Sequence, residues 1–137
     1  MNRNLFLLLL ATAILASSCT PKVKVVENPI FEQILTRDID ISRIEISDSA
    51  TLVTVDVTYY PNYWITFSKN THIEVEGQEF AATAIEGTEF DKRFWMPESG
   101  EAYCKLTLPP ISKKAKSMNF FEGSENSDWK IYDIDLT

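Results

Sequence analysis

The chain has 137 residues, with 13 basic and 20 acidic side chains that give a formal charge of −7. This length suits one compact domain and is short for two, and an acidic surface repels phosphate backbones, so we expect no nucleic-acid partner. An aromatic content of 12% is high for a disordered chain and indicates a folded core.

The N-terminus has the three parts of a secretory signal peptide. A charged start at Arg3 is followed by an apolar run over residues 5–15 and by the small residues 16–18. A membrane-spanning helix needs about 20 apolar residues, so this run is too short to cross a bilayer. We expect residues 1–18 to be removed as a signal peptide, which leaves 119 residues with 12 basic and 20 acidic side chains.

Cys19 directly follows the small residues, so the segment resembles the signal of a bacterial lipoprotein. In that family the cysteine carries acyl chains such as palmitate and becomes the new N-terminus. The usual pattern has Leu three residues before the cysteine, whereas here Ala16 takes that place. A plain signal peptide with a chance cysteine, or cleavage after Ala16, is the alternative. The resemblance implies a membrane anchor on Cys19, because each buried methylene adds about 0.8 kcal/mol of membrane affinity.

The residues after the cysteine lead into the folded domain. Residues 19–29 are predicted to hold the lipidated cysteine and a tether that runs into a first edge strand, and residues 30–137 the domain. Residues 28–35 (NPIFEQIL) have helical spacing but span only about two turns, so helix and non-helix both stay open. Residues 38–47 alternate with period two and change phase near Ser42-Arg43, where a bulge would bring all the isoleucines to one side.

Further strands follow in chain order. In residues 51–60 three valines alternate with polar residues, which predicts a half-buried antiparallel strand. The run at 63–68 follows a break at Pro61, and residues 72–85 form two runs joined by a hairpin turn at Glu76-Gly77-Gln78. Residues 86–100 are predicted to form a long loop. The last predicted strands lie within residues 101–110, 115–121 and 128–136.

The pattern as a whole predicts an all-β fold. Short strands with turns every 8 to 12 residues are typical of a β-sandwich. We therefore expect an immunoglobulin-like antiparallel β-sandwich of seven to nine strands. A closed barrel of similar size is the alternative, because alternation alone does not distinguish the two.

No residue constellation points to catalysis, a metal or a cofactor. Cys104 alternates with apolar residues and is expected in the core, without a disulfide partner if Cys19 is lipidated. His72 is the only histidine and is expected on the surface of a strand, which argues against a zinc site or a histidine-based triad. The Asp-Ile-Asp stretches at 38–40 and 133–135 are expected to place aspartates on the solvent face, although calcium accepts such oxygens.

Aromatic residues form the candidate binding surface. Adjacent aromatics cannot all point inward from a strand, so some rings should lie at the surface, where flat rings stack on sugars or anchor protein partners. The alternative is that the loop folds back and its rings cap one end of the sandwich. The predicted surface consists of Tyr60, Tyr63, Trp64, Phe94 and Trp95.

Asp48-Ser49-Ala50 resembles the Asp-Ser/Thr-aliphatic O-glycosylation site of exported Bacteroidetes proteins. This resemblance implies a sugar on Ser49, at a predicted turn where an enzyme could reach the hydroxyl. A three-residue pattern also recurs by chance.

Three stretches, YYPNYWITF, RFWMPESGEA and FFEGSENSDWKIYDIDLT, carry a wider resemblance. They are similar to the N-terminal β-sandwich region that precedes a thioredoxin-like domain in some Bacteroidetes envelope proteins, over residues 28–137. This resemblance implies envelope residence, a sandwich fold and an accessory or recognition role. The catalytic cysteines of the redox domain have no counterpart, because the sequence stops where that domain would begin.

These expectations lead to one leading function and two alternatives. The leading hypothesis is a lipid-anchored, non-enzymatic envelope module that binds a protein partner or serves as an accessory. The alternatives are a glycan-binding module and an accessory subunit of a thiol-disulfide oxidoreductase. Residues 20–24 lack the acidic run that often accompanies surface export in this phylum, which favours an outer-membrane anchor facing the periplasm and leaves surface exposure open.

Overall fold

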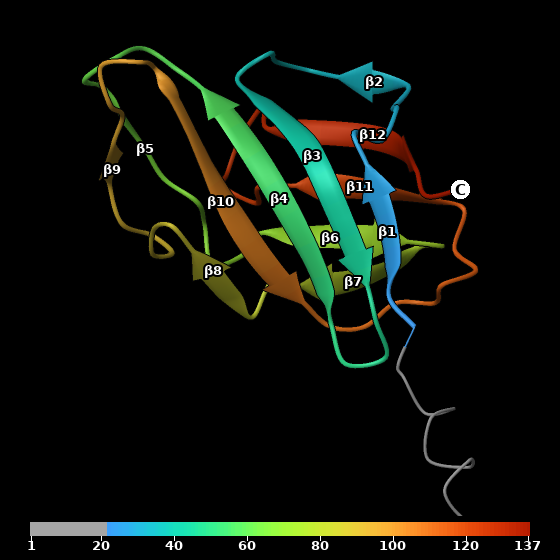
Figure 1. The fold of residues 1–137 in the computed structure, drawn as a ribbon. Coiled ribbons are helices and arrows are strands. Elements are labelled where there is room, and N and C mark those ends of the chain that lie inside the picture. Colours follow the sequence, from blue (N-terminus) through green and yellow to red (C-terminus); the bar gives the residue numbers. More distant parts are fainter. Residues whose placement is uncertain (1–21) are drawn as a thin grey trace, which may run out of the picture.

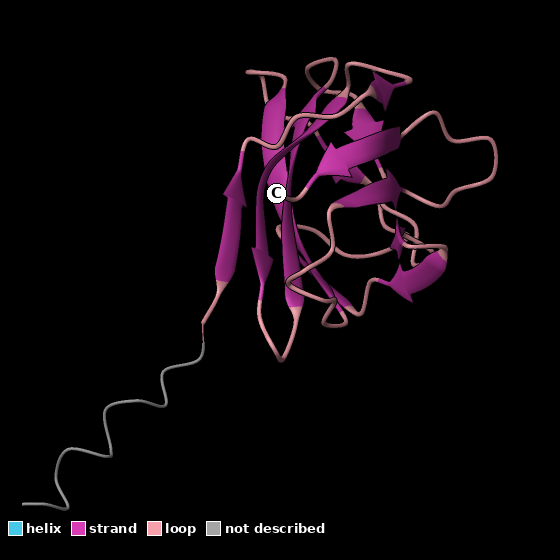
Figure 2. Ribbon diagram, turned by 90° about the vertical axis from the view of Figure 1, so that its right-hand side faces the viewer, coloured by secondary structure: helices cyan, strands magenta, loops and turns pink. Residues whose placement is uncertain are grey.

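The computed structural model describes residues 22–137, which form strands and loops without a helix (Figures 1 and 2). The predicted signal peptide and Cys19 lie outside the described residues. Within residues 22–137 no helix is long and apolar enough to cross a membrane. The strands are β1 (Lys24–Glu27), β2 (Gln33–Ile34), β3 (Ile39–Ile46), β4 (Thr51–Thr58), β5 (Trp64–Ile65), β6 (His72–Val75), β7 (Gln78–Ala81), β8 (Ala84–Glu86), β9 (Phe94–Trp95), β10 (Glu101–Leu108), β11 (Ser117–Phe121) and β12 (Lys130–Asp135).

The predicted antiparallel β-sandwich is confirmed. One five-stranded sheet has the order β1-β3-β4-β10-β8 and the other β2-β12-β11-β6-β7, and β5 and β9 form a separate two-stranded ribbon. The strands of the second sheet cross behind those of the first (Figure 1). Nine strands have three residues or more, and β2, β5 and β9 have two each, so the described part holds more strands than the seven to nine predicted.

The core forms between the two sheets from alternating apolar side chains. In β4 all three valines are buried, whereas Asp56 and Thr58 are exposed, as the period of two predicts. In β3 the register against β4 shifts between Ile41 and Arg43. This bulge turns Ile39, Ile41, Ile44 and Ile46 toward the core and confirms the kink predicted there.

The β6–β7 hairpin confirms the turn predicted at Glu76-Gly77. Both residues have positive φ, 51° and 78°, which is the geometry of a type I′ turn and favours glycine at the second place. The run that follows does not stay in one sheet. β7 pairs with β6, whereas β8 pairs with β10 in the other sheet, so the chain crosses between the sheets at residues 82–83.

The first residues of the domain differ from the predicted boundary. Lys24–Glu27 forms the first edge strand that was predicted after a tether, and it pairs with β3, so the sandwich begins at Lys24 and not at residue 30. For residues 28–35 the sequence allowed either a helix or a non-helical segment, and the structure has the short strand β2 there. Lys24 lies opposite Ile46, next to the β3–β4 turn. The chain therefore joins the sandwich at that end, which is drawn at the bottom of Figure 1.

Candidate functional site

The two-residue strands β5 and β9 set the positions of the two most exposed tryptophans. Trp64 pairs with Trp95, and Ile65 pairs with Phe94. Because successive side chains of a strand point to opposite sides, Ile65 is buried while Trp64 and Trp95 are 42% and 61% exposed. Phe94 is partly buried against the core, so it does not belong to the exposed surface predicted to include it.

The loop between β4 and β5 adds two tyrosines beside this pair. The Tyr63 amide donates to the Tyr60 carbonyl at 3.2 Å, and Asn62 adopts a positive φ of 64° to close the turn. The ring centroids of Tyr60 and Tyr63 lie 5.6 Å apart, and the two side chains are 67% and 62% exposed. We call Tyr60, Tyr63, Trp64 and Trp95 the aromatic edge; it lies at the upper left of Figure 1, where β5 and β9 are drawn.

The aromatic edge is fixed to the sandwich by its backbone. The Met96 amide donates to the Tyr63 carbonyl at 2.7 Å, and the Asn62 amide donates to the Met96 carbonyl at 3.1 Å. Met96 itself is buried in the core. The Arg93 guanidinium lies 4.5 Å from the centre of the Trp64 ring, a cation–π contact that orients this indole. These contacts fix the backbone that carries the rings and orient the Trp64 indole before any partner binds, which lowers the entropic cost of binding.

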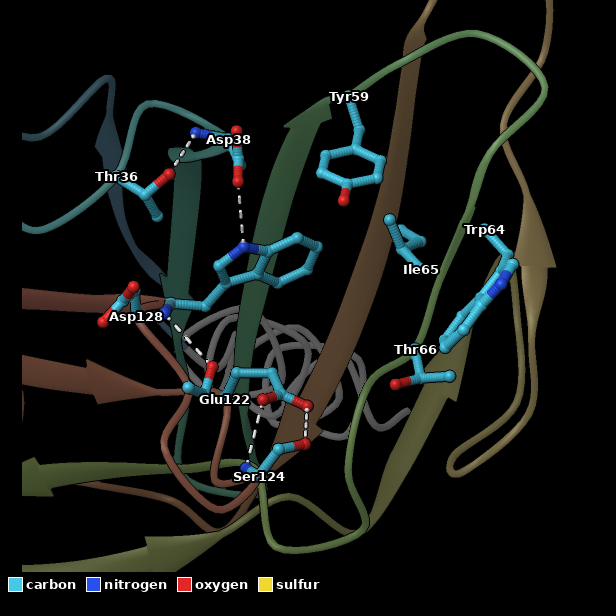
Figure 3. Close-up of a pocket in the computed structure, with 11 residues that line it drawn as sticks. Thr36, Asp38, Tyr59, Trp64, Ile65, Thr66, Glu122, Ser124 and Asp128 are labelled. Atoms are coloured by element: carbon cyan, nitrogen blue, oxygen red, sulfur yellow. Dashed lines mark hydrogen bonds between the residues drawn. The ribbon is translucent and has the colours of Figure 1, made fainter.

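A polar cavity of about 340 Å³ lies beside the aromatic edge and shares Trp64 with it (Figure 3). Its lining brings together three segments that are far apart in the sequence: residues 36–38, 59–66 and 122–129. It contains four serine or threonine residues, three carboxylates, three aromatic rings and Ile65. In Figure 3, Thr36 and Asp38 lie across the cavity from Trp64, and Tyr59 lies at the top between Asp38 and Trp64.

Trp129 is the central ring of this lining, and it is held from several directions. Its indole Nε1 donates to Asp38 Oδ2 at 3.3 Å, and its backbone amide donates to Ser127 Oγ at 3.1 Å. Its ring meets Phe67 edge-on with centroids 5.6 Å apart. The indole therefore lies beside Asp38, and Asp38 lies across the cavity from Trp64 (Figure 3).

Glu122 places a buried carboxylate at the base of the cavity, and both of its oxygens accept hydrogen bonds. Its Oε1 accepts hydrogen bonds from the Ser68 amide and the Ser124 hydroxyl, both at 2.7 Å, and its Oε2 accepts from the Ser124 amide at 3.1 Å. The Thr71 hydroxyl donates to the Glu122 carbonyl at 2.8 Å. Glu122 thus ties the loop after β11 to the turn at residues 68–71, and its role is structural.

Cys104 lies in the core, as predicted, and is a free thiol. Burial raises the pKa of this thiol to about 12, with a further contribution from the negative charge of Asp56. Only the thiolate is nucleophilic, so this residue is inert at neutral pH.

The other titratable candidates are accounted for by local contacts. His72 is half-buried on β6, stacks on Phe121 with centroids 5.1 Å apart, and its Nδ1 lies 2.8 Å from the Asn70 carbonyl. Asp135 accepts hydrogen bonds from the hydroxyl and the amide of Thr137, which hold its pKa below the ordinary value. Over residues 22–137 no three His, Cys, Asp or Glu side chains gather as a metal site would require.

Ser49 lies exposed in the turn between β3 and β4, where the O-glycosylation pattern had placed it. The Ser47 hydroxyl lies 3.1 Å from that of Ser49, and the preceding Asp48 is paired with Lys113 at 3.1 Å. The turn presents the hydroxyl to solvent; the modification itself stays a prediction.

The structure adds residues to the site that sequence reasoning missed. Trp129 and Asp128 line the cavity, and the signal available for them was the mixture of aromatic and polar residues in SENSDW. Asp38, which the Asp-Ile-Asp stretch was expected to place on the solvent face, also lines the cavity. Tyr103 is also exposed, at 72%, but it lies in β10 on the outer face of the first sheet and outside the aromatic edge.

The chain matches no family model, no curated protein and no solved structure. The resemblance to a sandwich that precedes a thioredoxin-like domain therefore stays a prediction.

Proposed function

We propose that the protein is a lipid-anchored, non-enzymatic module of the cell envelope that binds a partner through its aromatic edge. The observation that carries this proposal is the exposed cross-strand pair of Trp64 and Trp95, flanked by Tyr60 and Tyr63. Tryptophan and tyrosine dominate the energetically important positions of protein interfaces. Four such rings, fixed by backbone contacts and left in solvent, are best explained by a partner that covers them.

The aromatic edge lies at the end of the sandwich opposite the point where the chain enters, which is compatible with an N-terminal membrane anchor. The sandwich begins at Lys24, beside the β3–β4 turn, whereas the loop that carries the tyrosines leaves the opposite end of β4, where Thr58 pairs with Glu101. A lipid on Cys19 would leave the aromatic edge directed away from the membrane. We propose an outer-membrane anchor that faces the periplasm, with exposure at the cell surface as the alternative.

A protein partner is the leading form of this proposal. One such partner is a separately encoded thiol-disulfide oxidoreductase, which the resemblance to thioredoxin-associated sandwiches suggests. In that case the thiol chemistry would belong to the partner, because Cys104 is buried and its thiol has a pKa of about 12.

The second candidate is a glycan-binding module, and a specific observation favours it. The exposed aromatic rings adjoin a cavity lined by hydroxyl and carboxylate groups, with Trp64 common to both. Flat rings stack on the apolar faces of sugars, while carboxylates accept hydrogen bonds from sugar hydroxyls.

The proposal is tested by capturing partners from intact cells with the lipidated protein after cross-linking. We expect the wild type and a Tyr103→Ala control to recover the same protein or polysaccharide, and the double variant Trp64→Ala/Trp95→Ala to lose it. Tyr103 is a suitable control because it is an aromatic residue even more exposed than the two tryptophans, and it lies on the outer face of the first sheet. Equal recovery by all three proteins would show that the aromatic edge is not the binding surface.

A further inference from the structure

The cavity beside the aromatic edge has a composition that restricts what can enter it. It is lined by the carboxylates of Asp38, Glu122 and Asp128 and by no lysine, arginine or histidine. The charged side chains of the lining are all carboxylates, which repel anions, so phosphorylated, sulfated and uronic-acid ligands are disfavoured. The Arg93 guanidinium lies on the Trp64 ring but is not part of the lining. A ligand that enters must be neutral or positively charged.

Part of this lining is already used by the protein itself. Glu122 accepts three hydrogen bonds from Ser68 and Ser124, and Asp38 Oδ2 accepts the indole proton of Trp129. Asp128 is exposed at the rim and keeps its carboxylate available to a ligand. The other polar side chains of the lining carry hydroxyls: Thr36, Tyr59, Thr66, Ser124 and Ser127.

Two aromatic rings flank these polar groups. Trp129 lies beside Asp38, and Asp38 lies across the cavity from Trp64. A sugar ring has apolar C–H faces and hydroxyls around its circumference, so it can stack on an indole while it donates hydrogen bonds to carboxylates. A volume of about 340 Å³ is at the lower end of the range of small-molecule sites, which is about 300 to 1,000 Å³, and suits one or two sugar rings.

We propose that this cavity binds one neutral sugar residue of a glycan, whose neighbouring residues continue over Trp64 and Trp95. The inference deepens the glycan-binding form of the proposed function and rests on it. A lysine side chain of a protein partner is the competing occupant that the charge would admit. A lysine ammonium can lie over an indole face, as the Arg93 guanidinium does over Trp64, but it accepts no hydrogen bond from the hydroxyls of the lining. A sugar stacks on an indole and also exchanges hydrogen bonds with both hydroxyls and carboxylates, so it uses more of this lining.

The three tryptophans of the chain allow the site to be tested directly, because all of them lie here. Trp64 and Trp129 line the cavity, whereas Trp95 lies only on the aromatic edge. The three indole N–H resonances of ¹⁵N-labelled mature protein carrying Cys19→Ser would be followed during titration. The probes are methyl β-glucoside, methyl α-mannoside, N-acetylglucosamine and cellobiose, with glucuronic acid and trilysine as charged counterparts.

We expect at least one neutral sugar to shift the resonances of Trp129 and Trp64 in a saturable manner, and glucuronic acid to shift neither. Shifts confined to Trp64 and Trp95 would overturn the cavity site while leaving glycan binding by the aromatic edge in place. The absence of a Trp129 shift with every neutral sugar, or a Trp129 shift of equal size with trilysine or glucuronic acid, would also overturn it. Partner capture by the aromatic edge does not depend on any of these results.

A matched pair of variants distinguishes the effect of a carboxylate in the cavity from the effect of charge elsewhere on the surface. Asp128→Asn removes the available carboxylate, whereas Glu125→Gln removes an exposed charge from the same loop outside the cavity. We expect Asp128→Asn to weaken sugar binding by roughly tenfold, the loss of one charge-assisted hydrogen bond, and Glu125→Gln to leave it unchanged. Equal affinities of the two variants would contradict the assignment of Asp128.

Discussion

The turn at Gly123 connects the cavity to the sandwich, and its geometry predicts a large effect of a single methyl group. Gly123 has a positive φ of 89°, and a Cβ atom built on it would lie 2.3 Å from the Asn70 carbonyl oxygen. The neighbouring Glu122 is bonded to Ser68 and Thr71 on the same turn. Because the obstacle is backbone held by these bonds, Gly123→Ala must displace the turn.

The magnitude follows from comparison with a second glycine. Gly77 has a similar φ of 78°, but a Cβ atom there would meet nothing within 4 Å. Gly77→Ala therefore carries only the cost of a left-handed conformation, about 1 kcal/mol. Gly123→Ala carries the same cost and an overpacking cost of about 2 kcal/mol, so its free energy of unfolding should fall by about 3 kcal/mol.

Urea unfolding followed by tryptophan fluorescence measures both variants. With a denaturant slope of about 2 kcal/mol/M, the extra cost at Gly123 lowers the unfolding midpoint by about 1 M below that of Gly77→Ala. Trp129 belongs to the same loop and should report the change. Equal midpoints for the two variants would refute the argument that close contact with Asn70 fixes this turn.

Three further predictions concern titration and anchoring. Burial and the charge of Asp56 raise the pKa of Cys104 from 9.0 to about 12, so its contribution to stability is complete below pH 9 and is lost as the pH rises toward 12. Urea unfolding at each pH should show this loss in the wild type and not in Cys104→Ala. An identical pH dependence of the two proteins would contradict the raised pKa. Thr137→Ala removes the hydroxyl that lowers the pKa of Asp135, so an NMR titration should give a higher pKa for this carboxyl, and an unchanged value would show that the hydroxyl bond is not its cause. Cys19→Ser should move the protein from the membrane fraction to the soluble envelope fraction, and sedimentation with membranes would exclude a lipid on this residue.

Local patterns in the sequence predicted the parts of the fold that depend on neighbouring residues. The alternation of β4, the bulge beside Arg43 and the turn at Glu76-Gly77 each arise from a few consecutive residues, so periodicity and turn chemistry were sufficient. The burial of Cys104 followed from the same alternation.

Pairing across the chain was not predictable in this way. The strand run predicted at 63–68 contains β5, but its pairing with β9, in which Trp64 meets Trp95 across about thirty residues of sequence, could not be predicted from local patterns. The long loop predicted over 86–100 instead contains β9, the partner of β5, and this pairing explains why Phe94 turns toward the core while Trp95 stays outside.

The exposed part of the candidate site was predictable and the cavity was not. Adjacent aromatics at residues 59–64 required some rings to face solvent, and the structure places Tyr60, Tyr63 and Trp64 there. The cavity arises where three distant segments converge, and Trp129 is directed into it by a bond to Asp38, 91 residues away. Such a contact depends on tertiary structure and cannot be predicted from the local composition of the sequence.

Site-specific photo-cross-linking in intact cells tests the role of the aromatic edge most directly. A photoreactive p-benzoylphenylalanine would replace either Trp95 or Tyr103, two exposed aromatic positions on different faces of the sandwich. The account predicts a discrete adduct from position 95, containing protein or carbohydrate, and none from position 103. An adduct from position 103 alone, or from neither position, would contradict the claim that the aromatic edge binds the partner.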